Sequence, residues 1–357
     1  MLLWMLACAG PGTGSGAGEA AAETGVAPAG RLLLRDGRLP GSTDPVDVLI
    51  EEGLIVAIGP ALSGEGAVVE DLGGRTLAPA FIDSHVHLAY LPMAEEMARG
   101  GVAAAVDLAA PIEFFAQDTA GLKVIAAGPM ITAPGGYPTT SWGRNGYGLE
   151  CADTAAAVVA ADQLLDAGAG VLKVPLTGSA LLSDEAIAAV AERAHLRGVK
   201  LAVHALGDAV AAQAARLGAD VLAHTPTETL SASTLSAWSG RAVVSTLHAF
   251  GDSEGARANL GALRGAGAVV LYGTDFGNSR TPGIQAEELE ALLGAGLSPA
   301  ELLAAGTSTP AAFWGLSHLG SLEPGKAASL LVLDADPLAD PLTLAAPSAV
   351  YLDGVRR

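Results

Sequence analysis

Hydrophobic positions fall into short runs broken by Gly, Pro and Asp, and the character of these runs changes along the chain. Between residues 31 and 75 the runs are short and strand-like, which is typical of a small β-meander. Two similar runs lie between 328 and 357. We therefore expect a small β-sandwich domain built from both chain ends, residues 31–75 together with 322–357.

From residue 76 to 321, runs of strand length alternate with longer helical stretches. One helix is expected to begin after Ser183, a favoured N-cap residue, and to close at Gly198. Eight strands alternating with helices fit an α/β fold, a (β/α)8 TIM-like barrel. An open doubly wound sheet is the alternative, but no G-x-G-x-x-G follows a strand. The eight strand candidates are LAPAFID, VAAAVDLA, LKVIAAG, GVLKVPL, VKLAVHA, ADVLAHT, RAVVSTL and AVVLYGTD.

Polar side chains interrupt five of these apolar strands near their carboxyl ends. His85 and His87 lie one residue apart, so on a strand they point to the same face. In a barrel, all the carboxyl ends meet at one mouth, which would bring polar residues far apart in the sequence into one pocket. A buried lysine is costly unless it is paired, so Lys173 requires a particular explanation. The six residues are His85, His87, Lys173, His204, His224 and Asp275.

The segment 129–152 is too long and too rich in glycine to be a plain connection. It follows the third predicted strand, on the face where barrel active sites form, and loops of this length are usually functional. Its Tyr137 and Arg144 are candidate substrate contacts. Tyr272 and Arg280, on either side of Asp275, are the other two. Either arginine is suited to a bidentate clamp on a carboxylate, although a solvent-exposed role is an equally good interpretation.

Three further histidines have different expected roles. His248 follows the seventh predicted strand and is a candidate for substrate contact and catalysis. His195 lies in a predicted helix and is expected on the surface, while His318 is expected to be structural.

Composition excludes several classes of function. The 357 residues are 50% hydrophobic and 16% charged, as in a globular protein. The formal charge of −19 argues against nucleic acid, whose phosphates require a basic surface. Two cysteines, Cys8 and Cys151, exclude a disulfide framework or a cysteine-based zinc site.

The segment 1–30 is expected to be signal-like and then a flexible linker. Cys8 follows MLLWMLA and precedes a glycine-rich run, an arrangement that resembles the end of a bacterial lipoprotein signal. The basic n-region of a signal is missing, so an accidental likeness stays an alternative. The first interpretation predicts a lipid anchor at Cys8 and a location in the cell envelope, lipid-anchored or periplasmic. The second leaves a cytoplasmic location open.

The motifs FIDSHVH, VLKV, AVHA, VLAHT and GTDFG resemble those of the amidohydrolase superfamily. The resemblance covers the chain from Arg31 to Arg357, and its closest branch is the imidazolonepropionase-related group that includes Xaa-Pro dipeptidases. Two departures are Ala223, where the branch often has Glu, and Ser329, where Asp is usual. Neither departure removes an expected ligand.

The resemblance implies a binuclear metal site. His85, His87 and Asp275 would bind one divalent ion, His204 and His224 a second, and a carboxylated Lys173 would bridge them. Burial lowers the pKa of a lysine, and its neutral amine can then form a carbamate. Such ligands favour Zn²⁺, with Mn²⁺ or Fe²⁺ as alternatives.

The expected activity is metal-dependent hydrolysis of an amide, peptide-like or acyl amino acid, or of an ester in a small-molecule substrate. Asp275 would act as general base and acid. One alternative is a mononuclear deaminase or cyclic-amide hydrolase of the imidazolonepropionase kind. The other is a non-catalytic, lipid-anchored binding protein. The resemblance also allows a homo-oligomer.

Overall fold

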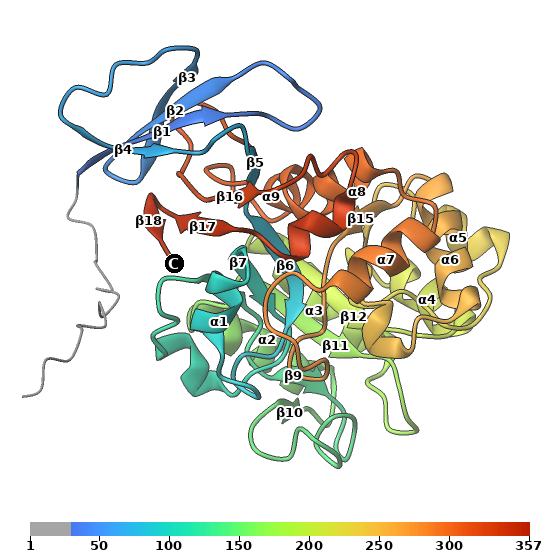
Figure 1. Ribbon diagram of the computed structural model, residues 1–357. Coiled ribbons are helices and arrows are strands. Elements are labelled where there is room, and N and C mark those ends of the chain that lie inside the picture. The colour runs from blue at the N-terminus through green and yellow to red at the C-terminus, as the bar shows by residue number, and fades with distance from the viewer. Residues whose placement is uncertain (1–29) are drawn as a thin grey trace, which may run out of the picture.

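The computed structural model describes residues 30–357, so the predicted signal-like segment and Cys8 lie outside the described residues. Within that range the chain forms two small sheets and a larger region of parallel strands and helices (Figure 1). No helix in this range is both long and apolar enough to cross a bilayer.

The first small sheet is made from the amino-terminal strands alone, in the order β3-β2-β1-β4. The second combines β5 with the carboxy-terminal strands, in the order β18-β17-β16-β5. Apolar residues of both sheets, among them Leu34 and Tyr351, form one buried cluster. The strands are β1 (Arg31–Gly37), β2 (Val46–Glu51), β3 (Leu54–Gly59), β4 (Ala67–Asp71), β5 (Thr76–Pro79), β16 (Leu330–Leu333), β17 (Ala349–Leu352) and β18 (Val355–Arg356).

The predicted strand LAPAFID is divided in the structure. Its first part, β5, pairs with β16 in the small sheets, whereas β6 (Phe81–Val86) begins the parallel region. Pro79 ends β5, and the chain changes sheet at Ala80, whose N–H donates to the Ser329 carbonyl. Thr76–Pro79 therefore lies with the small sheets, although the sequence pattern assigns it to the barrel.

The parallel strands form a three-stranded sheet, β6-β7-β8, and a five-stranded sheet, β11-β12-β13-β14-β15. Backbone hydrogen bonds link the two sheets on both sides. Ser84 N–H donates to Tyr272 O after β15 (2.9 Å), and Gly170 N–H donates to Ala126 O of β8 (3.1 Å). The remaining parallel strands are β7 (Val102–Asp107), β8 (Lys123–Ala126), β11 (Val171–Pro175), β12 (Lys200–His204), β13 (Val221–Leu222), β14 (Ala242–Val244) and β15 (Val269–Leu271).

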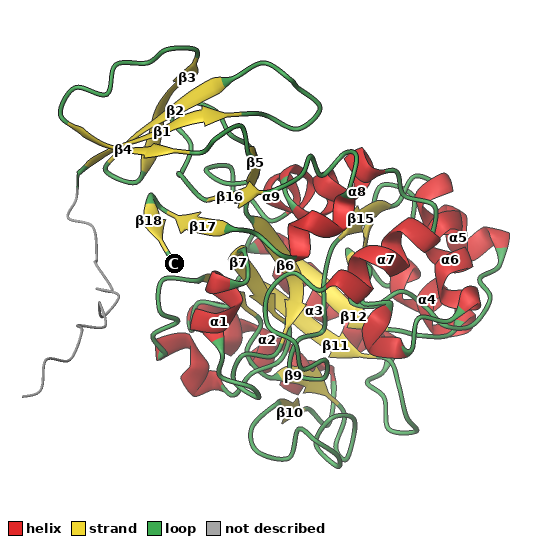
Figure 2. Ribbon diagram, in the orientation of Figure 1, coloured by secondary structure: helices red, strands yellow, loops and turns green. Residues whose placement is uncertain are grey.

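Helices surround these strands on the outside (Figure 2). Ser183 caps the helix after β11 by accepting from Ala186 N–H, as the sequence predicts. After β7, however, the expected helix is replaced by a short 3₁₀ turn, η1 (Ile112–Ala116). The helices are α1 (Ala94–Arg99), α2 (Thr154–Asp166), α3 (Asp184–Leu196), α4 (Asp208–Arg216), α5 (Ala232–Ala237), α6 (Glu254–Gly265), α7 (Ala286–Gly294), α8 (Pro299–Gly306) and α9 (Ser308–Phe313), with 3₁₀ turns η2 (His248–Phe250) and η3 (Pro341–Ala345).

Alternation along the parallel strands creates two apolar layers. Val171 belongs to a cluster on the inner face of the strands, while its neighbour Leu172 belongs to the larger core under the helices. Because strand side chains alternate, Lys173 shares the inner face with Val171. The strand period therefore directs this lysine inward, away from the helices.

Candidate active site

The six polar residues predicted from the strand ends are all buried, with exposed fractions between 0% and 7%. His85 lies on β6, Lys173 on β11 and His204 at the end of β12. The other three lie just beyond the carboxyl ends of β6, β13 and β15, and they are His87, His224 and Asp275. The structure therefore brings together the strand-end residues that the sequence pattern singled out.

His85, His87 and Asp275 are in direct contact. The Nε2 atoms of the two histidines are 3.2 Å apart, and Oδ1 of Asp275 lies 3.5 Å and 3.1 Å from them. Ligand atoms from all three residues lie within 4.8 Å of one another. Two imidazoles and one carboxylate at this spacing can hold a divalent metal ion.

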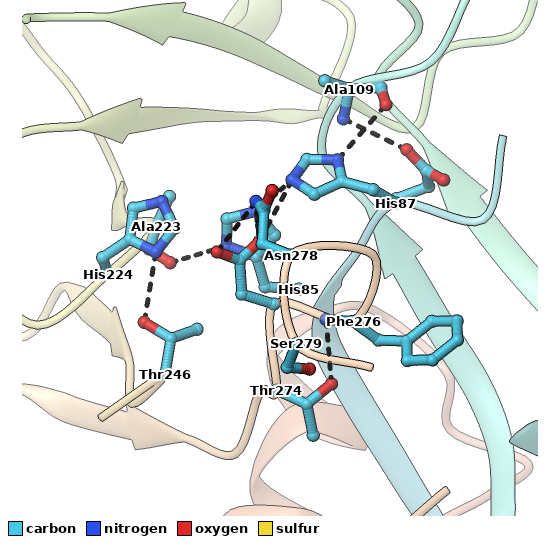
Figure 3. Close-up of polar contacts among 12 residues, drawn as sticks. His85, His87, Ala109, Ala223, His224, Thr246, Thr274, Phe276, Asn278 and Ser279 are labelled. Atoms are coloured by element: carbon cyan, nitrogen blue, oxygen red, sulfur yellow. Dashed lines mark hydrogen bonds and ion pairs between the residues drawn. The ribbon is translucent and has the colours of Figure 1, made fainter. Parts of the chain in front are cut away.

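Backbone carbonyls fix the orientation of both imidazoles (Figure 3). Nδ1 of His85 lies 2.7 Å from Ala223 O, and Nδ1 of His87 lies 3.3 Å from Ala109 O. With Nδ1 donating to a carbonyl, Nε2 carries the free lone pair and faces Asp275. Metal-ligating histidines use this same support from carbonyl or carboxylate partners.

Asp83, two residues before His85, holds the backbone around the first histidine pair. Its Oδ1 accepts from His85 N–H and Thr274 N–H (both 3.1 Å), and its Oδ2 accepts from the Thr274 hydroxyl (2.5 Å). Burial raises the pKa of Asp83 to about 7, and these hydrogen bonds act in the opposite direction. Asp83 therefore ties the end of β6 to the segment that carries Asp275.

Asp107, at the end of β7, supports His87 in a similar way. Its carboxylate accepts from Leu88 N–H (2.7 Å) and Ala109 N–H (3.1 Å), on either side of the His87 contact to Ala109 O. Burial raises the pKa of Asp107 to about 6, while the charge of His87 lowers it. Neither Asp83 nor Asp107 was predicted as a site residue. An acidic residue at an apolar strand end was the available signal for both.

Asp275 is placed by its own turn. Its φ of 51° is left-handed, and the Asn278 side-chain amide lies 3.1 Å from both of its carboxylate oxygens. Gly277, with φ 115°, is required here, because a Cβ at this position would lie 2.7 Å from the His87 Cβ. The GTDFG motif therefore packs directly on the first histidine pair.

His204 and His224 form the second part of the site. Their ring centroids are 4.7 Å apart, and the His224 ring is 4.5 Å from that of His85. Nδ1 of His224 lies 3.1 Å from the Thr246 hydroxyl. Burial, and next the positive charge of Lys173, lower the pKa of His204 to about 3. Burial also holds the pKa of His224 well below its usual value. Both rings are therefore neutral and able to act as ligands at neutral pH.

Lys173 is the most unusual residue of the site. Its side chain is fully buried, and Nζ has no hydrogen-bond partner within residues 30–357. Burial lowers its pKa from 10.5 to about 7, with the Asp275 carboxylate acting against this shift. Its charge also lowers the pKa of His85, His204 and His224, so the amine lies among the imidazoles. A buried amine without a partner within residues 30–357 is costly. Metal ions bound beside it would supply contacts that the Lys173 side chain lacks.

The predicted substrate loop 129–152 contributes an aromatic wall. It contains a two-stranded parallel sheet, β9 (Met130–Thr132) and β10 (Gly148–Glu150). Between them, the Tyr137 ring lies 5.3 Å from that of His204, and the Trp142 ring lies 5.2 Å from that of His87. Trp142 Nε1–H donates to the Tyr137 hydroxyl (2.7 Å), so this one bonded pair contacts both histidines.

Two aromatic neighbours of the site, Trp142 and Phe250, were not predicted from the sequence. Phe250 lies in η2, with its ring 4.5 Å from that of His224. A tryptophan in a glycine-rich loop was an available signal for Trp142. Phe250 had no comparable signal, because its position depends on how the chain turns after β14.

Of the other predicted substrate residues, Tyr272 is buried and Arg280 is exposed. Tyr272 is fully buried against Phe81 in the outer core, because it directly follows the inward-facing Leu271. This placement argues against the predicted substrate contact of Tyr272. Arg280 is exposed, with its guanidinium 5.7 Å from the centre of the Tyr90 ring.

Arg144 and His248 are exposed at their respective loops. Arg144 donates to Thr140 O of its own loop (3.2 Å). The His248 side chain is exposed at the start of η2, two residues before Phe250. His195, on α3, pairs with Asp220 at the surface, as expected for a residue outside the site.

Comparison with known proteins agrees with this geometry. Residues 76–356 match the model of the amidohydrolase family. The chain belongs to the amidohydrolase family. This family assignment makes it a hydrolase, and the buried His/Asp group of the site is consistent with the metal binding typical of amidohydrolases.

Solved structures extend the likeness over nearly the whole amidohydrolase chain. A Xaa-Pro dipeptidase with methionine bound in its active site is 20% identical, with 92% of this chain and 99% of that chain covered and a TM-score of 0.80. An ochratoxinase from A. niger is 18% identical, with 92% and 95% covered and a TM-score of 0.73. At these identities the likeness shows the fold, an α/β fold of the TIM-barrel type.

Curated relatives match this amidohydrolase only over short segments. A dihydroorotase from Streptomyces coelicolor is 40% identical over 58 residues, which is 16% of this chain and 13% of that protein. A dihydroorotase from Solibacter usitatus is 48% identical over 61 residues, or 16% and 14%. The matched segments therefore cover about a seventh of these relatives.

Proposed function

We propose that this amidohydrolase cleaves an amide bond, or an ester bond, of a small molecule with the help of two divalent metal ions, for which its ligands favour Zn²⁺. The observation that carries the proposal is the buried Lys173 amine, which has no partner within residues 30–357 and lies among the imidazoles of His85, His204 and His224, whose pKa values burial lowers. A cation in that position is unfavourable, whereas an anionic carbamate on Nζ, formed with carbon dioxide, would attract two metal ions.

In this proposal His85, His87 and Asp275 hold the first ion, and His204 and His224 hold the second. A carboxylated Lys173 would supply an oxygen ligand to each. Support comes from the contacts within the first group and from the hydrogen bonds that turn the lone pairs of His85 and His87 inward. Mn²⁺ or Fe²⁺ are alternatives that the same ligands accept.

When bound, the ions supply Lewis-acid polarisation of the scissile carbonyl and a nucleophile at neutral pH. Asp275 then takes a proton from the attacking water on its carboxylate and gives it to the leaving group. Asn278 donates to both oxygens of Asp275 and keeps the carboxylate in one orientation. The Tyr137 and Trp142 rings, which lie beside His204 and His87, exclude bulk water from the site.

We further propose substrates of the dipeptide or acyl amino acid kind. The Tyr137–Trp142 pair offers an apolar surface beside the histidines, and Arg280, stacked on Tyr90, offers a cation for a substrate carboxylate. Arg144 and His248 are both exposed and are proposed as outer contacts. The Xaa-Pro dipeptidase among the similar structures is consistent with this class and with the imidazolonepropionase-related branch.

The domain organisation belongs to the same proposal. We propose that the eight parallel strands close into one barrel, which the hydrogen bonds between the two parallel sheets support. The two small sheets would form the sandwich domain, which takes in β5 as well as 31–75 and 322–357. A lipid anchor at Cys8, a location in the cell envelope and assembly into a homo-oligomer stay predictions.

A mononuclear enzyme is the second candidate. The observation that favours it is that, among the described residues, His85, His87 and Asp275 alone form a group of histidine and acidic ligand atoms close enough to share an ion. Such an enzyme would hydrolyse a cyclic amide or deaminate its substrate. A mononuclear site does not explain why Lys173 is buried.

The number of bound metal ions distinguishes the candidates. We expect the 357-residue protein, produced with bicarbonate supplied, to hold two equivalents of metal per chain by plasma mass spectrometry. It should also hydrolyse members of a panel of Xaa-Pro dipeptides and acylated amino acids. One equivalent would favour the mononuclear enzyme, and none, without uptake on titration, would favour a binding protein that does no hydrolysis.

A further inference from the structure

Glu288 is a fully buried acid outside the set of proposed ligands. It lies in the first turn of α7, on the outer side of the strands, and its side chain has an exposed fraction of 0%. Oε1 accepts from Leu247 N–H (3.1 Å) and Oε2 accepts from His248 N–H (2.7 Å). Burying a carboxyl costs free energy. Because each oxygen of the Glu288 carboxyl accepts a hydrogen bond from a backbone amide, we expect this residue to have a role.

These two amides follow a strained residue. Thr246 has a φ of 41°, a left-handed conformation that is a clear outlier for a β-branched side chain. Leu247 then returns to right-handed helical angles, with φ −64° and ψ −46°. A left-handed residue followed by a right-handed one turns successive N–H groups to the same side and creates a concavity lined by hydrogen-bond donors. The Glu288 carboxyl fills that concavity.

The strained turn also reaches the second pair of histidines. The Thr246 hydroxyl lies 3.1 Å from Nδ1 of His224, and Figure 3 shows it directly beside that ring. Four residues later, Phe250 covers the same imidazole with its ring centroid 4.5 Å away. The two contacts that orient the His224 ring from this side therefore come from one short segment, 245–250.

We infer that Glu288 is a positioning residue, which acts from outside the site through Leu247 and His248. By accepting both amide protons, it holds segment 245–250 in the turn that places the Thr246 hydroxyl and the Phe250 ring against His224. A hydroxyl that accepts from Nδ1–H leaves the lone pair of His224 on Nε2. The effect on the His224 ring stands by itself, whereas its consequence for metal binding rests on the proposed function.

The test compares Glu288→Gln with Glu287→Gln, an exposed acid one residue earlier on α7. Glutamine keeps the size of Glu288 but presents an NH₂ group to one of the two amides, so one N–H loses its acceptor. In metal-free protein, nitrogen NMR of the histidine side chains reports which nitrogen of His224 carries the proton. We expect Glu288→Gln to mix the two tautomers of His224 and to speed amide exchange at Leu247 and His248. His85 and the control variant should be unchanged.

Metal titration gives the second readout. We expect Glu288→Gln to lower the affinity for the second metal ion by about 10-fold to 100-fold, the usual effect of removing a residue that supports a ligand. The affinity for the first metal ion should be unchanged. Thr246→Val, which removes the hydroxyl and keeps the branched shape, should have the same selective effect even if Glu288→Gln folds poorly.

Two results would overturn the inference. One is an unchanged His224 tautomer together with unchanged amide exchange in folded Glu288→Gln. The other is an unchanged affinity of Thr246→Val for the second metal ion. A wild-type protein that binds fewer than two ions would count against the proposed function instead, because the NMR and exchange measurements do not depend on metal.

Discussion

The two halves of the site are built in different ways. In the half formed by His85, His87 and Asp275, the facing atoms lie 3.1–3.5 Å apart and each imidazole is fixed by a backbone carbonyl. In the other half, the His204 and His224 rings meet edge-to-face, with their centroids 4.7 Å apart. Lys173 completes that half with an amine that has no partner within residues 30–357.

This difference indicates where the structure needs an added group. The orientation of the first half is fixed by two backbone carbonyls and by the buried carboxyls of Asp83 and Asp107. The second half keeps an isolated buried amine, which is unfavourable as a cation. We therefore expect the first half to bind metal by itself and the second to depend on the chemistry of Lys173.

The largest expected effect comes from the first half. Asp275→Asn keeps the shape of the side chain but removes its basicity and its charge. We expect kcat/KM for the best substrate to fall by about 10³-fold or more, because general acid–base catalysis alone contributes about 10²–10⁴-fold. The exposed Asp44→Asn serves as the surface control. A loss smaller than about tenfold would contradict the role of Asp275 as base.

Lys173→Ala separates the two halves. We expect the variant to retain one equivalent of metal and to lose the second, with a fall in kcat/KM of about 10²-fold to 10³-fold, since the bridging ligand is absent. Plasma mass spectrometry and steady-state kinetics measure the two quantities. Unchanged hydrolysis in Lys173→Ala would exclude the binuclear proposal.

Lys173→Met tests the cost of the buried amine in metal-free protein, in buffer without carbon dioxide. The pKa of Lys173 is lowered from 10.5 to about 7 in the folded state, so between these values the unfolded chain binds more protons and stability rises with pH. The cost of the charge is therefore complete below pH 7 and is relieved above it.

Lys173→Met should consequently stabilise the metal-free fold more at pH 6 than at pH 9. The difference is about 3 kcal/mol, from about 1.4 kcal/mol for each of the two pH units above 7. Urea unfolding of the variant and the wild type at both pH values measures it, and the subtraction removes the titrating groups that lie away from Lys173. A stabilisation of the same size at both pH values would contradict a buried, titrating amine.

The smallest effect is expected where the two halves share a wall. Trp142→Phe removes the N–H that donates to the Tyr137 hydroxyl but keeps an aromatic ring. One such hydrogen bond contributes about 0.5–1.5 kcal/mol, so we expect KM to rise about twofold to tenfold with kcat little changed. In Tyr137→Phe the same tryptophan change should have less effect, and full additivity in this double-mutant cycle would show that the pair does not act together.

Local patterns in the sequence predicted much of this arrangement. The spacing of His85 and His87, and the inward face of Lys173, follow from the strand period of two. The same period explains why the prediction for Tyr272 is not supported. Its neighbour Leu271 faces inward, so Tyr272 faces the helices. Alternation therefore predicts the facing of residues inside strands, and it continues for one residue beyond the end of β15.

Other features depend on contacts that no local pattern encodes. The division of LAPAFID between β5 and β6 follows from pairing with β16, which begins at Leu330, far along the chain from Pro79. The burial of Glu288, beside two exposed acids of the same helix at 287 and 290, depends on the turn after β14. Phe250 acquires its place over His224 from that same turn.

The sequence by itself determined which side chains stand at the strand ends, because strand periodicity and the polarity of each residue are local properties. It thereby determined the amidohydrolase family and the set of six polar residues. The tertiary structure alone decided which of them touch, which carbonyls and carboxyls fix their orientation, and which one has no partner among residues 30–357. These depend on the packing of segments far apart in the chain, where burial changes both the pKa and the cost of every polar group.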